Sequence, residues 1–434
     1  MKTVRIGICG LGTVGSGTFN VIQRNGQEIN ARAGCEIRIV QVGCRKDNPS
    51  CNTQDVAVTR DIFEVAKNPE VDILVELIGG TTTAKTLIET AIAHGKHVIT
   101  ANKALIAQHG NELFAMARAK GVSIAFEASV AGGIPIIRIL KEGLSANRIE
   151  WLAGIINGTG NFILTEMKDK GRSFESVLAE AQQLGYAEAD PTYDVEGIDA
   201  AHKLAILGSL AFGMPLQFAR VYTEGISKIA PVDVSYANEL GYRIKHLGIA
   251  RKHADNRVEL RVHPTFIPEK RLIASVDGVS NAVVVKGDAV GSTLYCGPGA
   301  GAEPTGSAVI SDIIELSRTL LAPPEYRAPY LGFQDDQLTS FSILDIEEIE
   351  TSYYLRMSAA DQPGVLSKIT QILSDAGISI EALIQKQPKD DDTQVPVILL
   401  TNKVLEKNLN RAISLIEALD TVEGPVVRIR VESL

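Results

Sequence analysis

Short apolar runs alternate with amphipathic segments along the first third of the chain. Apolar runs at residues 4–9, 36–44, 71–80 and 96–103 are typical of buried strands. Between them, residues 18–29 and the segment ending at His94 carry apolar positions at helical spacing. Strands separated by helices predict an α/β unit built on a parallel sheet. We expect this unit to span residues 1–135.

A glycine-rich turn links the first predicted strand to the first predicted helix. It reads GLGTVG. In this order the first glycine permits a tight turn, the second lets the backbone approach a pyrophosphate, and the third lets helix and strand pack closely. The pattern predicts a Rossmann dinucleotide-binding domain, with a glycine-rich turn of some other α/β protein as the alternative. The predicted cofactor contacts are Gly10, Leu11, Gly12, Thr13, Val14 and Gly15.

The end of the second strand bears on which dinucleotide is bound. NAD-selective sites usually place a carboxylate there to hold the ribose hydroxyls. Here Gly43 and Cys44 are followed by Arg45 and Lys46. Two cations favour a 2′-phosphate, so we expect NADP, with NAD possible and Arg45 as the main contact. The alternative is that both cations are part of a solvated loop.

Two further features lie near the predicted carboxyl edge of the sheet. Lys103 follows the fourth strand, where open parallel sheets bind ligands, although it could be a plain surface lysine. Glu127 precedes a stretch of small residues, Ala131-Gly132-Gly133, whose open carbonyls could hold a monovalent cation. On spacing alone, a tight turn between two domains is the preferred interpretation of this stretch.

The pattern changes after residue 135 and again after residue 350. Residues 136–325 combine strands such as 258–267 and 281–287 with helices, which predicts an α+β domain. A second glycine-rich turn feeds a helix near 305–320 that we expect to return to the first domain. Residues 322–329 are proline-rich and predict a linker. Residues 350–434 follow the order βαββαβ, a ferredoxin-like arrangement.

The most charged stretch of the middle domain lies between Gly185 and Lys203. It contains many carboxylates and one lysine, and it leads into the apolar run LAILGSLAFGM. Asp199 and Lys203 are four residues apart and share a helix face. A charge entering a core is costly unless it is paired or used. This stretch therefore predicts a polar substrate pocket, and a plain helix salt bridge is the alternative.

Composition narrows the class of protein. The 434 residues carry a net charge of −9, which gives no overall positive field for nucleic acid. No apolar run approaches the ~20 residues of a membrane helix, and the N-terminus lacks the layout of a signal peptide. Five cysteines, without paired zinc spacing, fit a reduced cytoplasmic protein.

Several motifs together resemble the bacterial homoserine dehydrogenases over the whole length of the chain. They are GLGTVG at 10–15, TANK at 100–103, EASVAGGIPI at 127–136, GIINGTGNFIL at 154–164, and GYAEADPTYDVEGIDAAHK at 185–203. The last is the most specific, and Gly160 departs from the threonine or cysteine of many members. The tail resembles an ACT domain, a module that senses small molecules in amino-acid biosynthesis.

The resemblance implies a reaction and a set of roles. The reaction is the reversible NAD(P)H-dependent reduction of L-aspartate 4-semialdehyde to L-homoserine. Lys203 would be the catalytic proton donor, and Lys103 would contact both substrate and nicotinamide. The remaining implied contacts are Glu188, Asp194 and Asp199 for the substrate, Gly185 and Gly301 for the cofactor, and Glu127, Val130, Gly132 and Ile134 for a monovalent cation, Na⁺ or K⁺. L-Threonine would inhibit through the ACT domain, and the family is usually dimeric or tetrameric.

Two other functions stay open at the level of sequence. An aldehyde-oxidising or phosphorylating dehydrogenase needs a nucleophilic cysteine, and none of the five sits in an activating context that we can identify. A non-enzymatic amino-acid sensor would bind nucleotide and amino acid without turnover. The presence of both Lys103 and Lys203 argues against the sensor. Free sheet edges within residues 258–290 and in the ACT domain are the expected sites of pairing between chains.

Overall fold

A parallel sheet forms the N-terminal part of the protein. The computed structural model describes residues 2–321, 327–386 and 393–434, so the first part of the predicted linker, 322–326, lies outside the described residues. The strands are β1 (Thr3–Cys9), β2 (Glu36–Gly43), β3 (Ala57–Thr59), β4 (Ile73–Glu76), β5 (His97–Thr100) and β6 (Ile124–Ala125). Their order, β3-β2-β1-β4-β5-β6, is that of a Rossmann fold and matches the predicted class.

Helices cover both faces of this sheet. They are α1 (Thr13–Ala33), α2 (Ile62–Lys67), α3 (Thr82–Ala93), α4 (Lys103–Ala119) and α11 (Ala302–Leu321). One core joins β1 and β2 to α1 and α11, and the other joins the sheet to α2, α3 and α4. Far apart in sequence, α11 packs directly against α1. A Cβ on Gly17 would lie 2.1 Å from the Ala302 oxygen, so these two helices can approach only where glycine leaves room.

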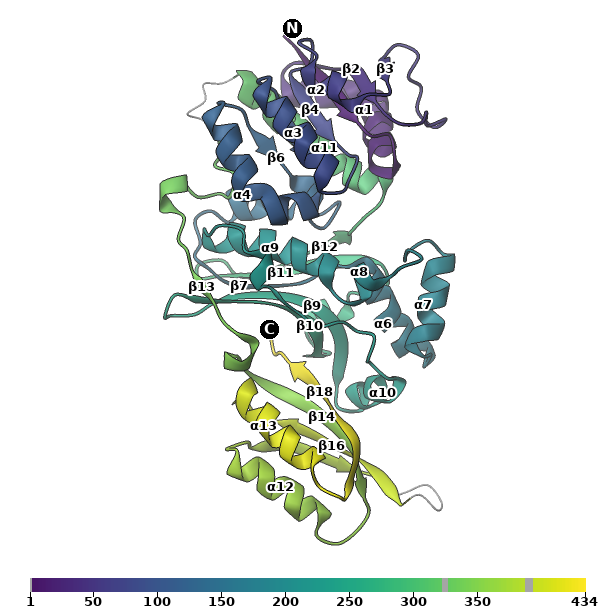
Figure 1. The fold of residues 1–434 in the computed structure, drawn as a ribbon, viewed down its shortest axis with the longest axis vertical. Helices are drawn as coiled ribbons and strands as arrows, with labels where there is room; N and C mark the ends of the chain where they lie inside the picture. The colour runs from purple at the N-terminus through teal and green to yellow at the C-terminus, as the bar shows by residue number, and fades with distance from the viewer. Residues whose placement is uncertain (1, 322–326, 387–392) are drawn as a thin grey trace.

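The middle of the molecule is an antiparallel sheet with helices on one side (Figure 1). Its strands are β7 (Ile149–Ile155), β9 (Tyr242–Lys252), β10 (Arg257–Pro268), β11 (Ser280–Gly287) and β12 (Gly291–Pro298), in the order β12-β11-β7-β9-β10. The helices are α5 (Ile136–Arg138), α6 (Gly158–Lys170), α7 (Phe174–Gln183), α8 (Thr192–Val195), α9 (Ile198–Phe212) and α10 (Pro231–Glu239). Helix α9 packs between this sheet and α4, which places it beside the nucleotide-binding part.

The C-terminal part follows the predicted βαββαβ order. It comprises β14 (Glu350–Ala360), α12 (Val365–Asp375), β15 (Ile380–Gln385), β16 (Gln394–Thr401), the short β17 (Val404–Leu405), α13 (Glu406–Glu417) and β18 (Val422–Val431). The sheet order is β18-β14-β16-β15. This arrangement is the expected ACT fold, and α12 and α13 pack against each other in Figure 1.

The middle and C-terminal sheets are continuous. Strand β18 pairs in parallel with β10, through Thr265 with Arg430 and Phe266 with Val431. The short strands β8 (Tyr222–Thr223) and β13 (Ser342–Ile343) pair with β10 as well. The expected free edge at the start of 258–290 is therefore wrong, because β10 has partners on both sides. The terminal strands of this sheet are β12 and β15.

Strand β10 also buries its polar face. Glu259, Arg261, His263 and Thr265 alternate with apolar residues, yet all are nearly inaccessible. Their polar groups bind other protein groups: the Arg261 guanidinium, for example, binds Glu259 at 2.8 Å and also Glu432, just after β18. The alternation predicted the strand correctly, but not the C-terminal segment that covers its polar side.

Candidate active site

The start of helix α9 carries the charged pair that the sequence singled out. Gly197, with a φ of 82°, precedes the first turn, and its missing side chain lets His246 approach. Asp199 and Lys203 then project one turn apart. The Lys203 Nζ lies 2.7 Å from Asp199 Oδ2 and 2.7 Å from the Ile156 carbonyl oxygen. An ammonium group has three N–H donors, so one remains unused among the described residues.

Lys103 reaches the same carboxylate from the opposite part of the molecule. It is the first residue of α4, which begins just past the end of β5, and Asn102 caps that helix through Leu105 N. Its Nζ lies 2.9 Å from Asp199 Oδ1. The Asp199 carboxylate thus bridges two ammonium groups across the boundary between the nucleotide-binding part and the middle sheet. Lys103 remains one-third exposed, and so faces the space between them.

Asn157 completes the cluster, and the sequence did not predict its role. Its Nδ2 donates to Asp199 Oδ2 at 2.9 Å and to Asp194 Oδ1 at 2.8 Å, while its Oδ1 accepts from Gly160 N. The motif GIINGTGNFIL at 154–164 indicated only the family resemblance. The available signal was an asparagine placed directly after a buried strand and before a helix, where it caps α6.

The cluster changes the pKa of every group in it. Burial opposes ionisation of Asp199, but the two lysines hold its pKa well below the usual range. Burial, helped by the charge of Lys103, lowers the pKa of Lys203 despite the attraction of Asp199. For Lys103 burial acts in the same direction, but Asp199 outweighs it and raises the pKa. Burial raises the pKa of Asp194. Lys203 is therefore the lysine better suited to proton transfer.

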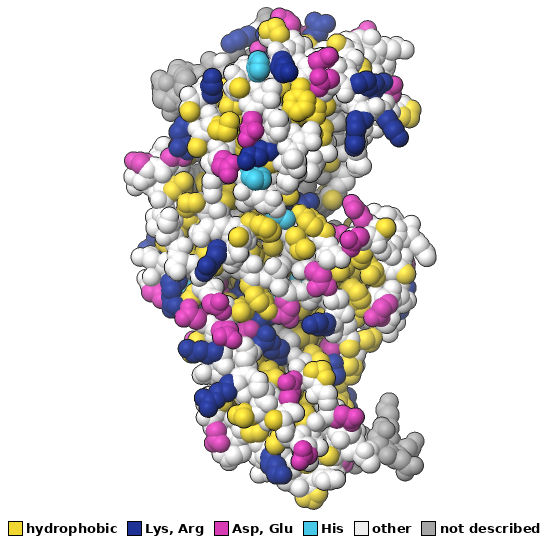
Figure 2. Space-filling model, in the orientation of Figure 1, with side chains coloured by type: hydrophobic (Ala, Val, Ile, Leu, Met, Phe, Trp, Pro, Cys, Tyr) yellow, Lys and Arg dark blue, Asp and Glu magenta, His cyan; other side chains and the backbone are white. Residues whose placement is uncertain are grey.

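The other carboxylates of the stretch, and Glu180 just before it, do not join Lys203. Glu180 pairs with Arg172, Glu196 accepts from Ser227, and Asp190 accepts from Thr192 N. Glu188 is exposed on the loop between α7 and α8, as is Gly185. Figure 2 shows a notch on the right of the molecule, between its upper and middle parts, with acidic side chains on the lower rim.

The glycine-rich turn has the geometry of a phosphate cradle. Gly10 has a φ of 103°, and a Cβ there would lie 2.6 Å from the Leu77 oxygen. A Cβ on Gly15 would lie 1.9 Å from the Gly10 oxygen, whereas one on Gly12 would meet nothing within 4 Å. No side chain caps α1 in the described structure, so the N–H groups of its first turn, including those of Thr13 and Val14, are available. These features fit a dinucleotide pyrophosphate.

Two other predicted cofactor contacts, Gly301 and Arg45, lie outside the glycine-rich turn itself. Gly301, with a φ of 129°, precedes α11 and stands where α11 meets α1. Arg45 is exposed in the loop after β2. The same loop approaches the turn through Asn48, whose amide donates to the Leu11 oxygen at 2.8 Å. Asp47 in this loop is paired with Arg60 at 2.8 Å, a contact that the sequence did not predict.

The predicted cation loop is a strained turn next to that junction. Ala131 and Gly132 both have positive φ, at 56° and 52°. The Val130 and Gly132 carbonyls accept no hydrogen bond within the described residues, whereas that of Ile134 accepts from Ile136 N. The Glu127 carboxylate accepts from Ile137 N and Arg138 N, and burial raises its pKa to about 7. Two free carbonyls beside a buried carboxyl group fit a hard cation.

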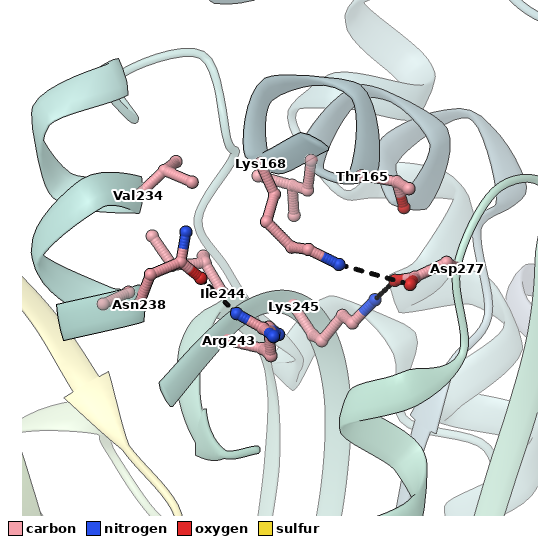
Figure 3. Close-up of a pocket in the computed structure, with 10 residues that line it drawn as sticks. Thr165, Lys168, Val234, Asn238, Arg243, Ile244, Lys245 and Asp277 are labelled. Carbon is pink, nitrogen blue, oxygen red and sulfur yellow. Dashed lines mark hydrogen bonds and ion pairs between the residues drawn. The ribbon is translucent and has the colours of Figure 1, made fainter. Parts of the chain in front are cut away.

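A second buried lysine shows what a purely structural site looks like. Lys245 lines a small cavity between α6, α10 and β9, where it and Lys168 converge on Asp277 (Figure 3). Its Nζ donates to Asp277 Oδ1 at 2.8 Å, Val276 O at 2.7 Å and Asn161 Oδ1 at 3.2 Å. All three donors are used, so Lys245 has none left for a ligand, in contrast to Lys203.

Comparisons with known proteins match every part of the chain. Family models match the homoserine dehydrogenase NAD-binding domain at residues 10–127, homoserine dehydrogenase at 135–314 and the ACT domain at 353–420. The homoserine dehydrogenase of Pseudomonas aeruginosa is 62% identical over 434 residues, which is 100% of both chains. The chain belongs to the homoserine dehydrogenase family. It is therefore an NAD(P)-dependent oxidoreductase, and the aldehyde-oxidising and sensor hypotheses are wrong.

Solved homoserine dehydrogenases share this architecture. The enzyme from Thiobacillus denitrificans has a TM-score of 0.94 and 59% identity, covering 100% of this chain and 99% of that one. A hyperthermophilic archaeal homoserine dehydrogenase in complex with NADPH has a TM-score of 0.62 and 27% identity, covering 74% of this chain and 99% of that one. In the described residues, no helix is long and apolar enough to cross a membrane.

Proposed function

We propose that the Lys103–Asp199–Lys203 cluster is where this homoserine dehydrogenase reduces L-aspartate 4-semialdehyde to L-homoserine. The observation that carries the proposal is the third N–H of Lys203, which has no partner among the described residues and belongs to a buried ammonium group whose other two donors are fixed. Asp199 and the Ile156 carbonyl orient that group, so its last donor has a defined direction. A fixed donor stabilises negative charge that develops in a transition state.

The proposed chemistry divides the work among the side chains. When bound, NAD(P)H supplies the hydride. Lys203 donates a proton to the aldehyde oxygen as negative charge builds there, and takes it back in the reverse direction. Lys103 adds a second positive charge beside the same oxygen. Because both Asp199 oxygens already accept from lysines, we assign Asp199 to holding them in place.

The substrate's own charges need partners as well. Its α-ammonium requires a carboxylate, and we assign Asp194 and Glu188 to it. Asp194 lies one hydrogen bond from the cluster, through Asn157. Glu188 lies on the exposed loop that borders α8, so it would meet substrate at the outer side of the site. An Asp194→Asn variant is expected to raise KM for the semialdehyde at least tenfold, measured at saturating cofactor.

The test of the main proposal is NADPH oxidation with L-aspartate 4-semialdehyde, followed by absorbance. Rapid turnover that depends on Lys203 supports the assignment. If wild-type protein turns over and Lys203→Ala does so equally well, the site lies elsewhere. Lys85→Ala, which removes an α3 lysine paired with Glu112, is the matched control and keeps full activity.

NADP is the cofactor we propose, with Arg45 holding its 2′-phosphate. The support is the pair of cations after β2, the nearby Arg60, and the archaeal relative in complex with NADPH. Arg45→Ala is expected to lower the ratio of kcat/KM for NADPH over NADH about tenfold. Arg38→Ala is the control, because Arg38 is also an exposed arginine and lies within β2. An unchanged ratio would refute the role of Arg45.

A monovalent cation, Na⁺ or K⁺, is proposed for the loop formed by Glu127, Val130, Gly132 and Ile134. Its support is the pair of carbonyls, on Val130 and Gly132, that accept no hydrogen bond among the described residues, in a turn where Ala131 and Gly132 have positive φ. At constant ionic strength, replacing choline chloride by NaCl or KCl is expected to raise the melting temperature. Gly132→Ala should abolish this difference, since a Cβ there would lie 2.5 Å from the Gly299 oxygen.

L-Threonine is the proposed effector of the ACT domain. Residues 359–366, Gln385 and Val397 line a cavity at the start of α12, where no described side chain caps the helix N-terminus at Gly364. Helix N–H groups there suit a carboxylate, and Asp361 suits an ammonium group. Asp361→Ala, in the turn before α12, is expected to abolish threonine inhibition, while Asp375→Ala, at the far end of α12, keeps it. Two further points remain predictions: that the protein forms a homo-oligomer, and that it lies in the cytoplasm. If chains pair through their sheets, the terminal strands β12 and β15 offer the edges.

A further inference from the structure

His202 lies one residue before Lys203 and contacts three helices of the active site. It is 1% exposed and sits on α9. Its Nδ1 lies 2.8 Å from the Tyr193 hydroxyl of α8 and 3.0 Å from the Ile198 carbonyl oxygen. Its Nε2 lies 3.1 Å from the Gln108 amide of α4. These helices carry the proposed site residues: Lys103 on α4, Asp194 on α8, and Asp199 and Lys203 on α9.

The hydrogen bonds determine the state of the imidazole. A carbonyl oxygen can only accept, so the contact with Ile198 requires the proton to be on Nδ1. That N–H is shared with the Tyr193 oxygen. Nε2 is then an acceptor, which suits the Gln108 amide nitrogen. Burial, with Lys103 and Lys203 nearby, lowers the pKa of His202 and keeps this neutral form.

Packing fixes the ring as firmly as the hydrogen bonds do. The Phe218 ring stacks on the imidazole with centroids 3.9 Å apart and an angle of 11°. The Tyr193 ring lies beside it at 5.6 Å, with the Lys103 ammonium 5.9 Å from the Tyr193 centroid. The imidazole thus cannot rotate without losing both its stacking partner and its polar partners.

We propose that His202 is a positioning residue, which locks α4, α8 and α9 together and so fixes Lys103 relative to Asp199 and Lys203. Helix α4 belongs to the nucleotide-binding part, whereas α8 and α9 belong to the middle part, as Figure 1 shows. The distance between the two lysines is therefore set across a boundary between separate sheets. A small displacement at that boundary would misplace the proton donor relative to the hydride donor. This inference rests on the proposed roles of Lys103 and Lys203.

The experiment compares His202→Phe, which keeps the stacking and removes all three polar contacts of the ring, with Tyr193→Phe, which removes one hydroxyl. We expect kcat to fall about 10- to 100-fold in His202→Phe and about 3- to 10-fold in Tyr193→Phe, with NADPH affinity unchanged. The primary isotope effect on kcat, measured with NADPH deuterated at the transferred position, should rise because hydride transfer becomes rate-limiting. His202→Asn should recover part of the loss, since its amide nitrogen can donate where Nδ1 does.

The outcomes separate this inference from the proposed function. His94→Phe, on an exposed histidine that ends α3, is the control and should match wild type. A wild-type kcat and isotope effect in His202→Phe, with or without a lower melting temperature, would overturn the positioning role. If His202→Phe does not fold, a wild-type kcat and isotope effect in Tyr193→Phe would overturn the positioning role instead. Should Lys203→Ala keep full activity, the proposed function itself fails; should it be inactive while the His202 variants behave as wild type, this inference alone fails.

Discussion

Two buried lysines, Lys203 and Lys245, show how residue environment separates chemistry from structure. Lys203 lies on helix α9 and Lys245 on strand β9 of the middle sheet, and each pairs with an aspartate. Lys245 uses all three donors, whereas Lys203 uses two. The sequence indicated Lys203 through its spacing from Asp199 and its family motif. Beyond the helix-cap position of Asn157, it could not indicate the roles of Asn157 and His202, because these depend on contacts with other helices.

Removing the Lys203 ammonium group should affect the chemical step. We expect Lys203→Ala to lower kcat by roughly 10²–10⁴ while the dissociation constant for NADPH stays nearly unchanged. The reason is that in the proposed mechanism the third donor of Lys203 serves the reacting oxygen, whereas its two observed contacts are with Asp199 and Ile156 and not with the cradle at Gly10–Gly15. Steady-state kinetics and NADPH fluorescence titration measure the two quantities. A loss confined to KM would contradict the proton-donor role.

His97 makes the stability of the nucleotide-binding part depend on pH. Burial, with Arg327 nearby, lowers its pKa to about 4 from 6.5, and its Nδ1 accepts from Ser123 N. The unfolded chain binds this proton more readily than the folded protein does. The contribution of neutral His97 to the free energy of unfolding is therefore complete above pH 6.5 and is lost as the pH drops toward 4. The expected loss is roughly 3 kcal/mol by pH 4. Urea titrations should show this dependence in wild type and in His94→Gln, but not in His97→Gln; an unchanged slope would contradict it.

At the scale of elements, the sequence predicted whether a segment is a helix or a strand better than it predicted how long that segment is. The run 71–80 became a strand of four residues, Ile73–Glu76, because the chain turns at Gly79 and Gly80, both with positive φ. The helix near 305–320 does lie against α1. That contact requires residues without side chains at the closest points: a Cβ on Gly306 would lie 2.9 Å from Thr18 N. Such close approaches involve pairs of helices, and one helix pattern alone does not encode them.

Glycine substitutions in α1 test this packing. Gly17→Ala is expected to destabilise the protein by about 1–3 kcal/mol, because its Cβ would meet the backbone of Ala302. It should also weaken NADPH binding, since the clash lies at the start of α11 beside Gly301. Gly26→Ala, in the same helix with nothing within 4 Å, should be neutral or stabilise by up to about 1 kcal/mol. Equal melting temperatures for the two variants would contradict the packing argument.

At the scale of the whole molecule, the ACT part is built into the catalytic sheet. Arg430 of β18 binds Glu406 at 2.6 Å and Glu224, just after β8, at 2.7 Å. Arg261 of β10 is 0% exposed and depends on Glu432. A sequence read domain by domain predicts a detachable tail, and so it misses this joint. Removing residues after 350 would leave Arg261 without Glu432, which is why point variants test threonine inhibition better than truncation.

Breaking this joint should cost more than breaking a surface pair. Glu432→Gln is expected to lower the free energy of unfolding by about 3–5 kcal/mol, because it leaves the Arg261 charge buried without its full partner. Glu348→Gln removes the exposed contact with Arg257, at 3.3 Å, and should cost less than about 1 kcal/mol. Denaturant unfolding monitored by tryptophan fluorescence compares them. A loss below about 1 kcal/mol in Glu432→Gln would show that the joint contributes little.

The pairing of β18 with β10 also constrains how the protein is made. During translation β10 leaves the ribosome long before β18, so in the nascent chain the edge at Thr265 and Phe266 stays unpaired and Arg261 lacks Glu432 until the last residues emerge. Unpaired edges of this kind invite aggregation. Chains that stop before β18 are therefore expected to aggregate more readily than the full-length chain. The pairing of β18 with β10 thus makes the solubility of the middle sheet depend on the last strand to be synthesised.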